Sequence, residues 1–175
     1  MGFKIGDKVV YPNQGIGIIE QINLNFVNGR PERCYLLRIV SNGLRVLIPE
    51  SNASNVGLRR VISSSEAKKI ISFLEANHVE VNGHHDWKHR FKENSERMRT
   101  GSLLDVAAVL KSLLALSKTK PLSFREKKLL ERARYLLISE LATACRATER
   151  RVEEEICRAL AKARLAFPDS ASTLS

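Results

Sequence analysis

Cysteine is scarce in this 175-residue chain, and its three cysteines are scattered rather than paired. Cys34, Cys145 and Cys157 form no Cys-x-x-Cys motif and follow no regular spacing. An odd, scattered set is typical of reduced thiols in a cytosol, and not of a disulfide framework or a zinc site. Cys157 also belongs to a helical pattern of apolar residues, which favours a packing role over a reactive one.

Long apolar runs and the motifs of common enzymes are missing as well. No stretch approaches the roughly 20 apolar residues of a membrane span, and the N-terminus lacks the apolar region of a signal peptide. The sequence contains no phosphate-binding glycine loop and no Gly-x-Ser-x-Gly motif. We therefore expect a protein that is not an enzyme, without a cofactor, a small-molecule substrate or a membrane partner.

Basic charge, in contrast, is abundant. The chain has 29 Lys and Arg residues against 19 Asp and Glu residues, which gives a formal net charge of +10. Such a balance favours a polyanionic partner, most often a nucleic acid. Both halves of the chain carry an excess of basic residues, so a basic surface on the helical half has to arise from local clustering.

The first 60 residues have the pattern of short β-strands. Apolar residues alternate with polar ones in four segments, 8–12, 16–22, 34–40 and 44–48. Asn28-Gly29 and Asn42-Gly43 are strong hairpin signals between such segments. Several short strands with tight turns predict a small SH3-like or Tudor-like barrel.

The remainder of the chain has the pattern of helices. Ser63-x-x-Glu66 and Ser123-x-x-Glu126 are capping boxes, and a strongly apolar helix is expected over 103–116. About five helices fit the pattern. The predicted fold class is α+β with more than one domain: a β-barrel domain at 1–53, a linker at 54–62, an all-α bundle at 63–167 and a disordered tail at 168–175.

Trp87 is the only tryptophan, and it lies among basic residues at the expected start of a helix. One interpretation is structural, because Trp87, Phe91 and Met98 fall near one another on a helix and could form a buried stripe. The other interpretation is a nucleic-acid contact. Basic groups bring phosphates close, and a flat apolar side chain can then stack on or wedge beside a base.

Three of the four histidines lie within residues 84–89. His85 and His89 have the spacing of two metal ligands on one helix face, but a zinc protease motif would need Glu directly after the first His, and Asp86 stands there. The chain has no further Cys/His cluster to complete a site. We expect no metal, and solvated histidines that add to a basic patch as the pH falls.

Longer motifs in both halves resemble the CarD/CdnL family of bacterial transcription regulators. In the first half these are Phe3-Lys4-Ile5-Gly6-Asp7-Lys8-Val9-Val10-Tyr11-Pro12-x-x-Gly15, Ile48-Pro49-Glu50 and Val56-Gly57-Leu58-Arg59. In the second half they include Trp87-x-x-Arg90-Phe91-Lys92-x-Asn94, Thr100-Gly101-Ser102 and Leu122-Ser123-x-x-Glu126-Lys127. The resemblance runs from about residue 3 to residue 165. Transcription-repair coupling factors carry a module similar to the first half alone, but this chain is too short for a helicase.

The resemblance implies that the barrel binds the β subunit of RNA polymerase by pairing a sheet edge with it. The matching strand spans 44–49, and the implied contact residues are Arg45, Leu47 and Pro49. Period two places these residues on one face, whereas Leu44, Val46 and Ile48 would fill the barrel core.

The resemblance also implies that the helical domain contacts promoter DNA at the upstream edge of the transcription bubble. Trp87 would wedge into the minor groove, Arg90 and Lys92 would hold phosphates, and Lys88 would support them. His89 stands where many members of the family have Arg, so one fixed charge is lost there.

The expected protein is therefore a monomer in the bacterial cytoplasm, associated with the nucleoid, that stabilises the open promoter complex. Two rival hypotheses remain: a sequence-specific DNA-binding repressor, and an adaptor that binds only protein and has a structural Trp87.

Overall fold

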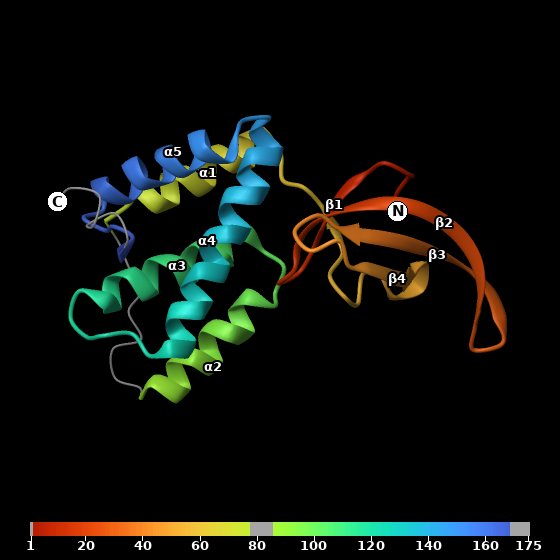
Figure 1. Ribbon diagram of the computed structural model, residues 1–175, viewed down its shortest axis with the longest axis horizontal. Helices are drawn as coiled ribbons and strands as arrows, with labels where there is room; N and C mark the ends of the chain where they lie inside the picture. The colour runs from red at the N-terminus through yellow and green to blue at the C-terminus, as the bar shows by residue number, and fades with distance from the viewer. Residues whose placement is uncertain (1, 78–85, 169–175) are drawn as a thin grey trace. The chain divides into compact units, whose positions relative to one another are not determined.

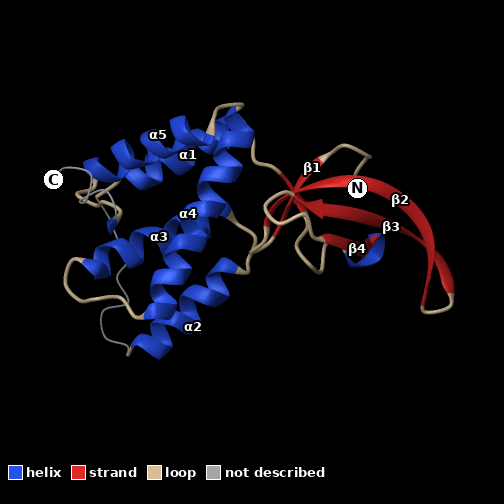
Figure 2. Cartoon of the chain, viewed as in Figure 1, coloured by secondary structure: helices blue, strands red, loops and turns tan. Residues whose placement is uncertain are grey.

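A computed structural model describes residues 2–77 and 86–168 of the chain. It divides into two compact units, Met1–Val61 and Ile62–Ser175. The described strands all lie in the first unit, and the described α-helices all lie in the second (Figures 1 and 2). This is the α+β arrangement that the sequence predicts, with a Tudor-like first part.

The first unit is a five-stranded antiparallel sheet with the strand order β4-β3-β2-β1-β5. Its elements are β1 (Lys8–Tyr11), β2 (Gly15–Val27), β3 (Arg30–Ile39), β4 (Arg45–Pro49), the 3₁₀ helix η1 (Glu50–Asn52) and β5 (Arg59–Arg60). Val9, Ile19, Tyr35, Leu37 and Ile48 are at the centre of its core. This small core is tightly packed at Gly17. A Cβ added there would lie 2.5 Å from the Leu37 side chain, which is too close unless Leu37 moves.

The hairpin of β2 and β3 is longer than the sequence pattern predicts. Asn28 and Gly29 make its turn with positive φ angles of 53° and 78°, as expected for an Asn-Gly hairpin. Leu24 and Phe26 lie on the extra length of β2 and are exposed. In Figure 1 this hairpin extends well past β4.

The predicted linker at 54–62 is wrong for Arg59 and Arg60. These two residues form β5 and pair with Val10 and Val9 of β1. The pairing partner lies about 50 residues away in the sequence, so a local pattern cannot reveal it. The boundary between the two compact units falls after Val61.

The second unit contains the five predicted helices. They are α1 (Ser64–Glu75), α2 (Trp87–Met98), α3 (Leu103–Ser117), α4 (Phe124–Cys145) and α5 (Glu149–Lys162). The capping boxes at the starts of α1 and α4 are both formed, with Ser63 and Ser123 as the N-cap residues. α3 is buried along most of its length, as its apolar sequence predicts.

Within this unit, α1 and α5 run side by side, and α2 packs against α3 and α4 (Figure 1). A single cluster of buried apolar side chains joins the five helices. No helix in the part of the chain that the structure describes is both long and apolar enough to cross a bilayer. The predicted disordered tail lies, apart from Pro168, outside the described residues.

Candidate functional site

Trp87 is the first residue of α2, and its N-cap residue is Asp86. The side chain of Trp87 remains 39% exposed. The buried residues of α2 are Arg90, Asn94 and Met98, so Trp87 lies at the outer end of this stripe and not inside it. The side chain is therefore accessible to a partner while its helix is anchored to the bundle.

Asp86 fixes the backbone next to Trp87. Its Oδ1 accepts a hydrogen bond from the His89 backbone N–H at 2.9 Å and lies 2.7 Å from the His89 Nδ1. These hydrogen bonds, first that from the backbone and then that from the ring, lower the pKa of Asp86. His89 is exposed, and its ring lies against the Asp86 carboxylate.

Arg90 has a different environment from the one predicted for a phosphate-binding residue. Its guanidinium is buried, and its Nε lies 3.4 Å from the Oε2 of Glu126, which is fully buried. Glu126 is also the capping-box residue of α4 and accepts a hydrogen bond from the Ser123 N–H at 3.2 Å. The charge of Arg90 is therefore used inside the helical unit, where it joins the first turns of α2 and α4.

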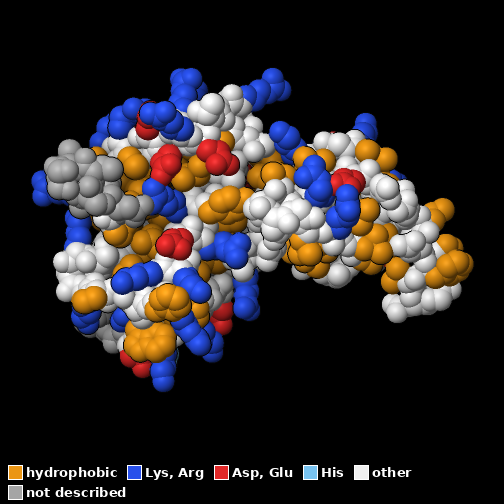
Figure 3. Space-filling model, viewed as in Figure 1, with side chains coloured by type: hydrophobic (Ala, Val, Ile, Leu, Met, Phe, Trp, Pro, Cys, Tyr) orange, Lys and Arg blue, Asp and Glu red, His pale blue; other side chains and the backbone are white. Residues whose placement is uncertain are grey.

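Lys88 and Lys92 lie one turn apart on α2 and are both exposed. They remain candidates for contacts with phosphates beside Trp87. Figure 3 shows blue Lys and Arg side chains around orange apolar ones at the lower end of the helical unit, where Figure 1 shows that α2 and α4 begin. Acidic side chains, among them the exposed Asp86 and Glu93 of α2, lie at the same end. Apolar side chains with cations beside them are the groups that a stacking contact with nucleic acid uses.

Sequence reasoning missed an aromatic residue at this end of the unit. Phe124 is the first residue of α4, is 71% exposed, and has the Lys128 Nζ 4.7 Å from its ring centroid. On the neighbouring helix, the Phe91 ring has the Arg125 guanidinium 5.9 Å from its centroid. The sequence does show basic residues around the capping box Ser123-x-x-Glu126. It does not show that the Phe124 side chain is exposed.

Metal binding at the histidines finds no support in the described residues. His85 lies outside them, and within them no group of three or more His, Cys, Asp or Glu side chains could hold a metal ion.

In the first unit, β4 is an edge strand, and β3 is its only partner among the described residues. Arg45 is exposed, Leu47 is 48% exposed and Pro49 is partly buried, whereas Ile48 points into the core. The predicted role of Leu44 in the core is wrong: it precedes the strand and is exposed. Arg45 forms an ion pair with Glu20 at 3.3 Å on the sheet face.

The hydrogen-bond phase of β4 determines which backbone groups face outward. The Ile39 N–H donates to the Leu44 carbonyl at 2.8 Å, so the Leu44 carbonyl faces β3, while the Leu44 N–H donates to the Asn42 Oδ1 at 2.9 Å. Bonding alternates along an antiparallel ladder, so Val46 and Ile48 direct their N–H and C=O groups toward β3. Those of Arg45 and Leu47 point to the outer edge, where another strand could pair with them.

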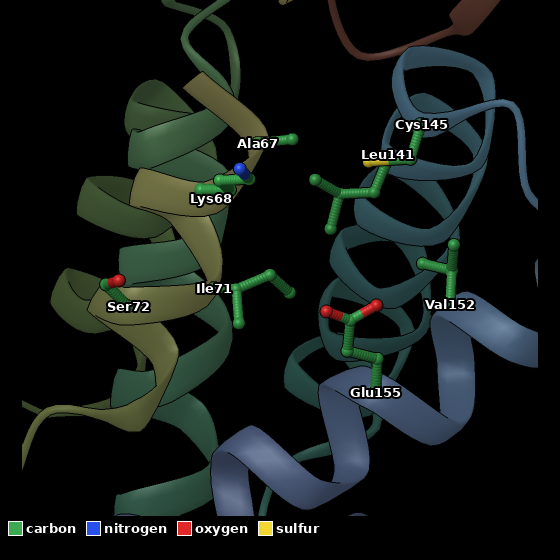
Figure 4. Close-up of a pocket in the computed structure, with 8 residues that line it drawn as sticks. All are labelled: Ala67, Lys68, Ile71, Ser72, Leu141, Cys145, Val152 and Glu155. Atoms are coloured by element: carbon green, nitrogen blue, oxygen red, sulfur yellow. The ribbon is translucent and has the colours of Figure 1, made fainter. Parts of the chain in front are cut away.

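A cavity of about 230 Å³ lies between α1, α4 and α5 (Figure 4). Ile71, Leu141 and Val152 supply apolar lining, and Lys68 and Glu155 add charge. None of the predicted site residues borders it. We interpret it as a gap between packed helices and not as the functional site.

Comparisons with known proteins place both units in one family. The CarD-like/TRCF RID domain matches residues 3–62, and the CarD C-terminal domain matches residues 69–157. YdeB of Bacillus subtilis, a protein named as a transcription factor, is 33% identical over 151 residues, which cover 86% of this chain and 97% of YdeB. A solved structure of CdnLNt from Myxococcus xanthus is 46% identical, covers 36% of this chain and 89% of that one, and has a TM-score of 0.30.

The chain thus combines an antiparallel sheet whose edge strand is β4 with a helical unit that begins α2 with a partly exposed tryptophan. The chain belongs to the CarD/CdnL family, which is a family of transcription factors.

Proposed function

We propose that this protein is a transcription regulator that binds RNA polymerase and stabilises the open promoter complex. The observation that carries the proposal is the position of Trp87: it begins α2, is more than one-third exposed, and has the exposed Lys88 and Lys92 on the same helix. A buried tryptophan would have favoured the rival role of a protein-only adaptor. The proposed partners are the polymerase β subunit and promoter DNA.

The first unit supplies the polymerase contact through β4. Pairing with a strand of the polymerase uses the outward N–H and C=O groups of Arg45 and Leu47, and the Leu47 side chain adds an apolar contact. Pro49 ends the strand with no N–H to donate, so the pairing would stop there. The match of residues 3–62 to the CarD-like/TRCF RID domain supports polymerase binding by this unit.

The second unit acts on DNA at the upstream edge of the bubble. Trp87 enters the minor groove there, and its insertion costs a few kcal/mol of base unstacking, least where the duplex is already open. A contact that exists only in the open complex shifts the equilibrium toward it by its own free energy. A shift of about 1.4 kcal/mol changes the ratio of open to closed complexes about tenfold.

The basic residues around Trp87 have separate roles in this proposal. Lys88 and Lys92 contact phosphates, and His89, which follows Lys88 on the same helix, assists them. Arg90 orients α2 through Glu126 and does not reach the DNA. Minor-groove readout is degenerate, so the protein should bind many promoters with little preference for sequence.

The unit that binds polymerase and the unit that contacts DNA belong to the same chain. Binding to polymerase raises the local concentration of the helical unit at the promoter, so affinity for free DNA can be weak. A single copy carries both surfaces, so we propose that the protein acts as a monomer on the bacterial nucleoid, without a cofactor.

Polymerase binding is tested with the full-length protein, a fluorescent label and purified polymerase. Leu47→Asp places a carboxylate on the free edge and should weaken binding at least tenfold. Leu104→Asp is the matched control, because Leu104 is also 48% exposed but lies on α3. Equal affinities of the two variants would contradict the assignment of β4.

A further inference from the structure

The cavity between α1, α4 and α5 takes no part in the contacts proposed with polymerase and DNA, yet three helices converge on it. Ile71 lines it from α1, Leu141 from α4 and Val152 from α5. Figure 4 shows Ile71 and Leu141 pointing toward one another across the space. Its volume of about 230 Å³ is far more than a single water molecule needs, so the cavity has room for a small organic molecule.

The lining of this cavity changes from apolar to charged. Leu141 and Val152 are buried and form its apolar inner wall, whereas Lys68 and Glu155 are exposed. Binding sites for small molecules commonly combine apolar walls with a few polar groups, because the walls give affinity and the polar groups fix the orientation. The arrangement therefore favours a ligand with an apolar body and a charged end.

Lys68 and Glu155 give the cavity one charge of each sign, from α1 and α5 respectively. In Figure 4 the Glu155 carboxylate is turned into the space between the helices. Within residues 2–77 and 86–168, neither side chain forms an ion pair or a side-chain hydrogen bond, so the two charges do not neutralise each other. A ligand with a single charge would meet one group of like sign. A ligand that carries both charges would find a partner for each.

We propose that this cavity binds a small zwitterion with an aliphatic body, of the class of α-amino acids with a branched aliphatic side chain. The ligand carboxylate faces the Lys68 ammonium, and the ligand ammonium faces the Glu155 carboxylate. The aliphatic side chain lies against Ile71, Leu141 and Val152. Because such a ligand contacts three helices at once and binds only the folded unit, it also stabilises that unit. The proposal is independent of the roles assigned to β4 and Trp87.

The charge pattern of the ligand is tested by isothermal titration calorimetry on the full-length protein. The probes are leucine, isocaproate, which lacks the amino group of leucine, and isoamylamine, which lacks the carboxylate. We expect saturable binding of leucine, and binding of each analogue weaker by about tenfold or more, because one charged contact is lost. An analogue that binds as tightly as leucine would overturn the zwitterion assignment. No binding of leucine, isoleucine or valine at millimolar concentrations would overturn the site.

The two charged residues are tested by substitution at positions that are exposed, so that the fold is retained. Lys68→Gln and Glu155→Gln should each weaken leucine binding about tenfold. The matched controls are Lys69→Gln and Glu154→Gln, which remove exposed charges from the same two helices outside the cavity lining. These should keep the leucine affinity within about twofold, since exposed charges outside a site contribute little. An equal loss of affinity in the controls would overturn the assigned contacts.

Cys145 provides a readout of the position of the ligand in the wild-type protein. Its thiol is exposed and borders the cavity, whereas Cys157 is half-buried and is not part of the lining. Leucine should slow the alkylation of Cys145 by iodoacetamide, measured by mass spectrometry of the digested protein, and leave the rate at Cys157 unchanged. Leucine binding by calorimetry with an unchanged rate at Cys145 would overturn the placement. None of these outcomes bears on the proposed function, which the Trp87 and β4 variants test separately.

Discussion

Arg90 and Glu126 form a buried ion pair, with the Arg90 Nε 3.4 Å from the Glu126 Oε2, that connects the first turns of α2 and α4. The pair is shielded from water at both ends, since Glu126 is fully buried and Arg90 is almost so. The Arg90–Glu126 pair thereby holds α2, which carries Trp87, to α4, and removal of either charge should destabilise the unit. Breaking a buried pair leaves an uncompensated charge, which costs far more than losing a surface pair.

Replacement of Arg90 should therefore destabilise the protein and not only weaken DNA binding. Arg90→Met should lower the free energy of unfolding by about 3 kcal/mol, because the Glu126 carboxylate loses its buried partner. Lys92→Met, an exposed change on the same helix, should alter it by less than about 0.5 kcal/mol. Urea denaturation followed by circular dichroism measures both. If Arg90→Met were as stable as Lys92→Met, Arg90 would be a surface cation in solution and its predicted phosphate contact would stand again.

The acid stability of the Trp87 segment should depend on Asp86. Hydrogen bonds from His89 lower the pKa of Asp86 from its ordinary value of 3.8, so the ionised carboxylate stabilises the folded state. This contribution is present above pH 3.8 and is lost as the pH falls below it through the lowered pKa. Unfolding of the wild type and of Asp86→Asn, measured between pH 6 and pH 2.5, should show a wild-type advantage at pH 6 that disappears toward the acid end. A constant difference would mean that the charge of Asp86 contributes nothing.

Lys111 should influence stability in the alkaline range, where stability should again rise with pH. Its ammonium is buried between helices and donates to the carbonyls of Phe73 and Ala76 at 2.7 and 2.6 Å at the end of α1. Burial lowers the pKa of Lys111 from 10.5. The folded protein therefore releases this proton at a lower pH than the unfolded chain, and its stability relative to Lys111→Met should rise with pH until about pH 10.5. Chemical denaturation from pH 8 to pH 11 measures this difference, and a decline over that range would contradict the burial of the charge.

Sequence patterns located the helices well where the signal is local. The capping boxes at Ser63 and Ser123 act over three residues, and both are formed as predicted. The apolar helix at 103–116 is also buried as predicted, because its composition leaves no polar face to expose.

Contacts between residues that are far apart in the sequence could not be predicted from local patterns. Arg59 and Arg60 become a strand only because Val9 and Val10 lie beside them, and Arg90 becomes internal only because Glu126 packs against it from another helix. Neither partner is close in sequence. Phe124 differs from Arg90 in the opposite sense. It is an aromatic residue at the start of an amphipathic helix, yet its side chain is exposed and not packed into the core. The residues whose roles changed are thus those whose environment is set by a second element.

The role of Trp87 is tested most directly by the lifetime of open promoter complexes formed by RNA polymerase with its primary sigma factor at fixed salt. The lifetime is compared without the protein, with the wild type, and with Trp87→Ala, after confirming that both proteins bind polymerase equally. We expect the wild type to lengthen the lifetime and Trp87→Ala to lose most of this effect. Equal lifetimes with the wild type and with Trp87→Ala would contradict the wedge and assign the activity to the first unit alone.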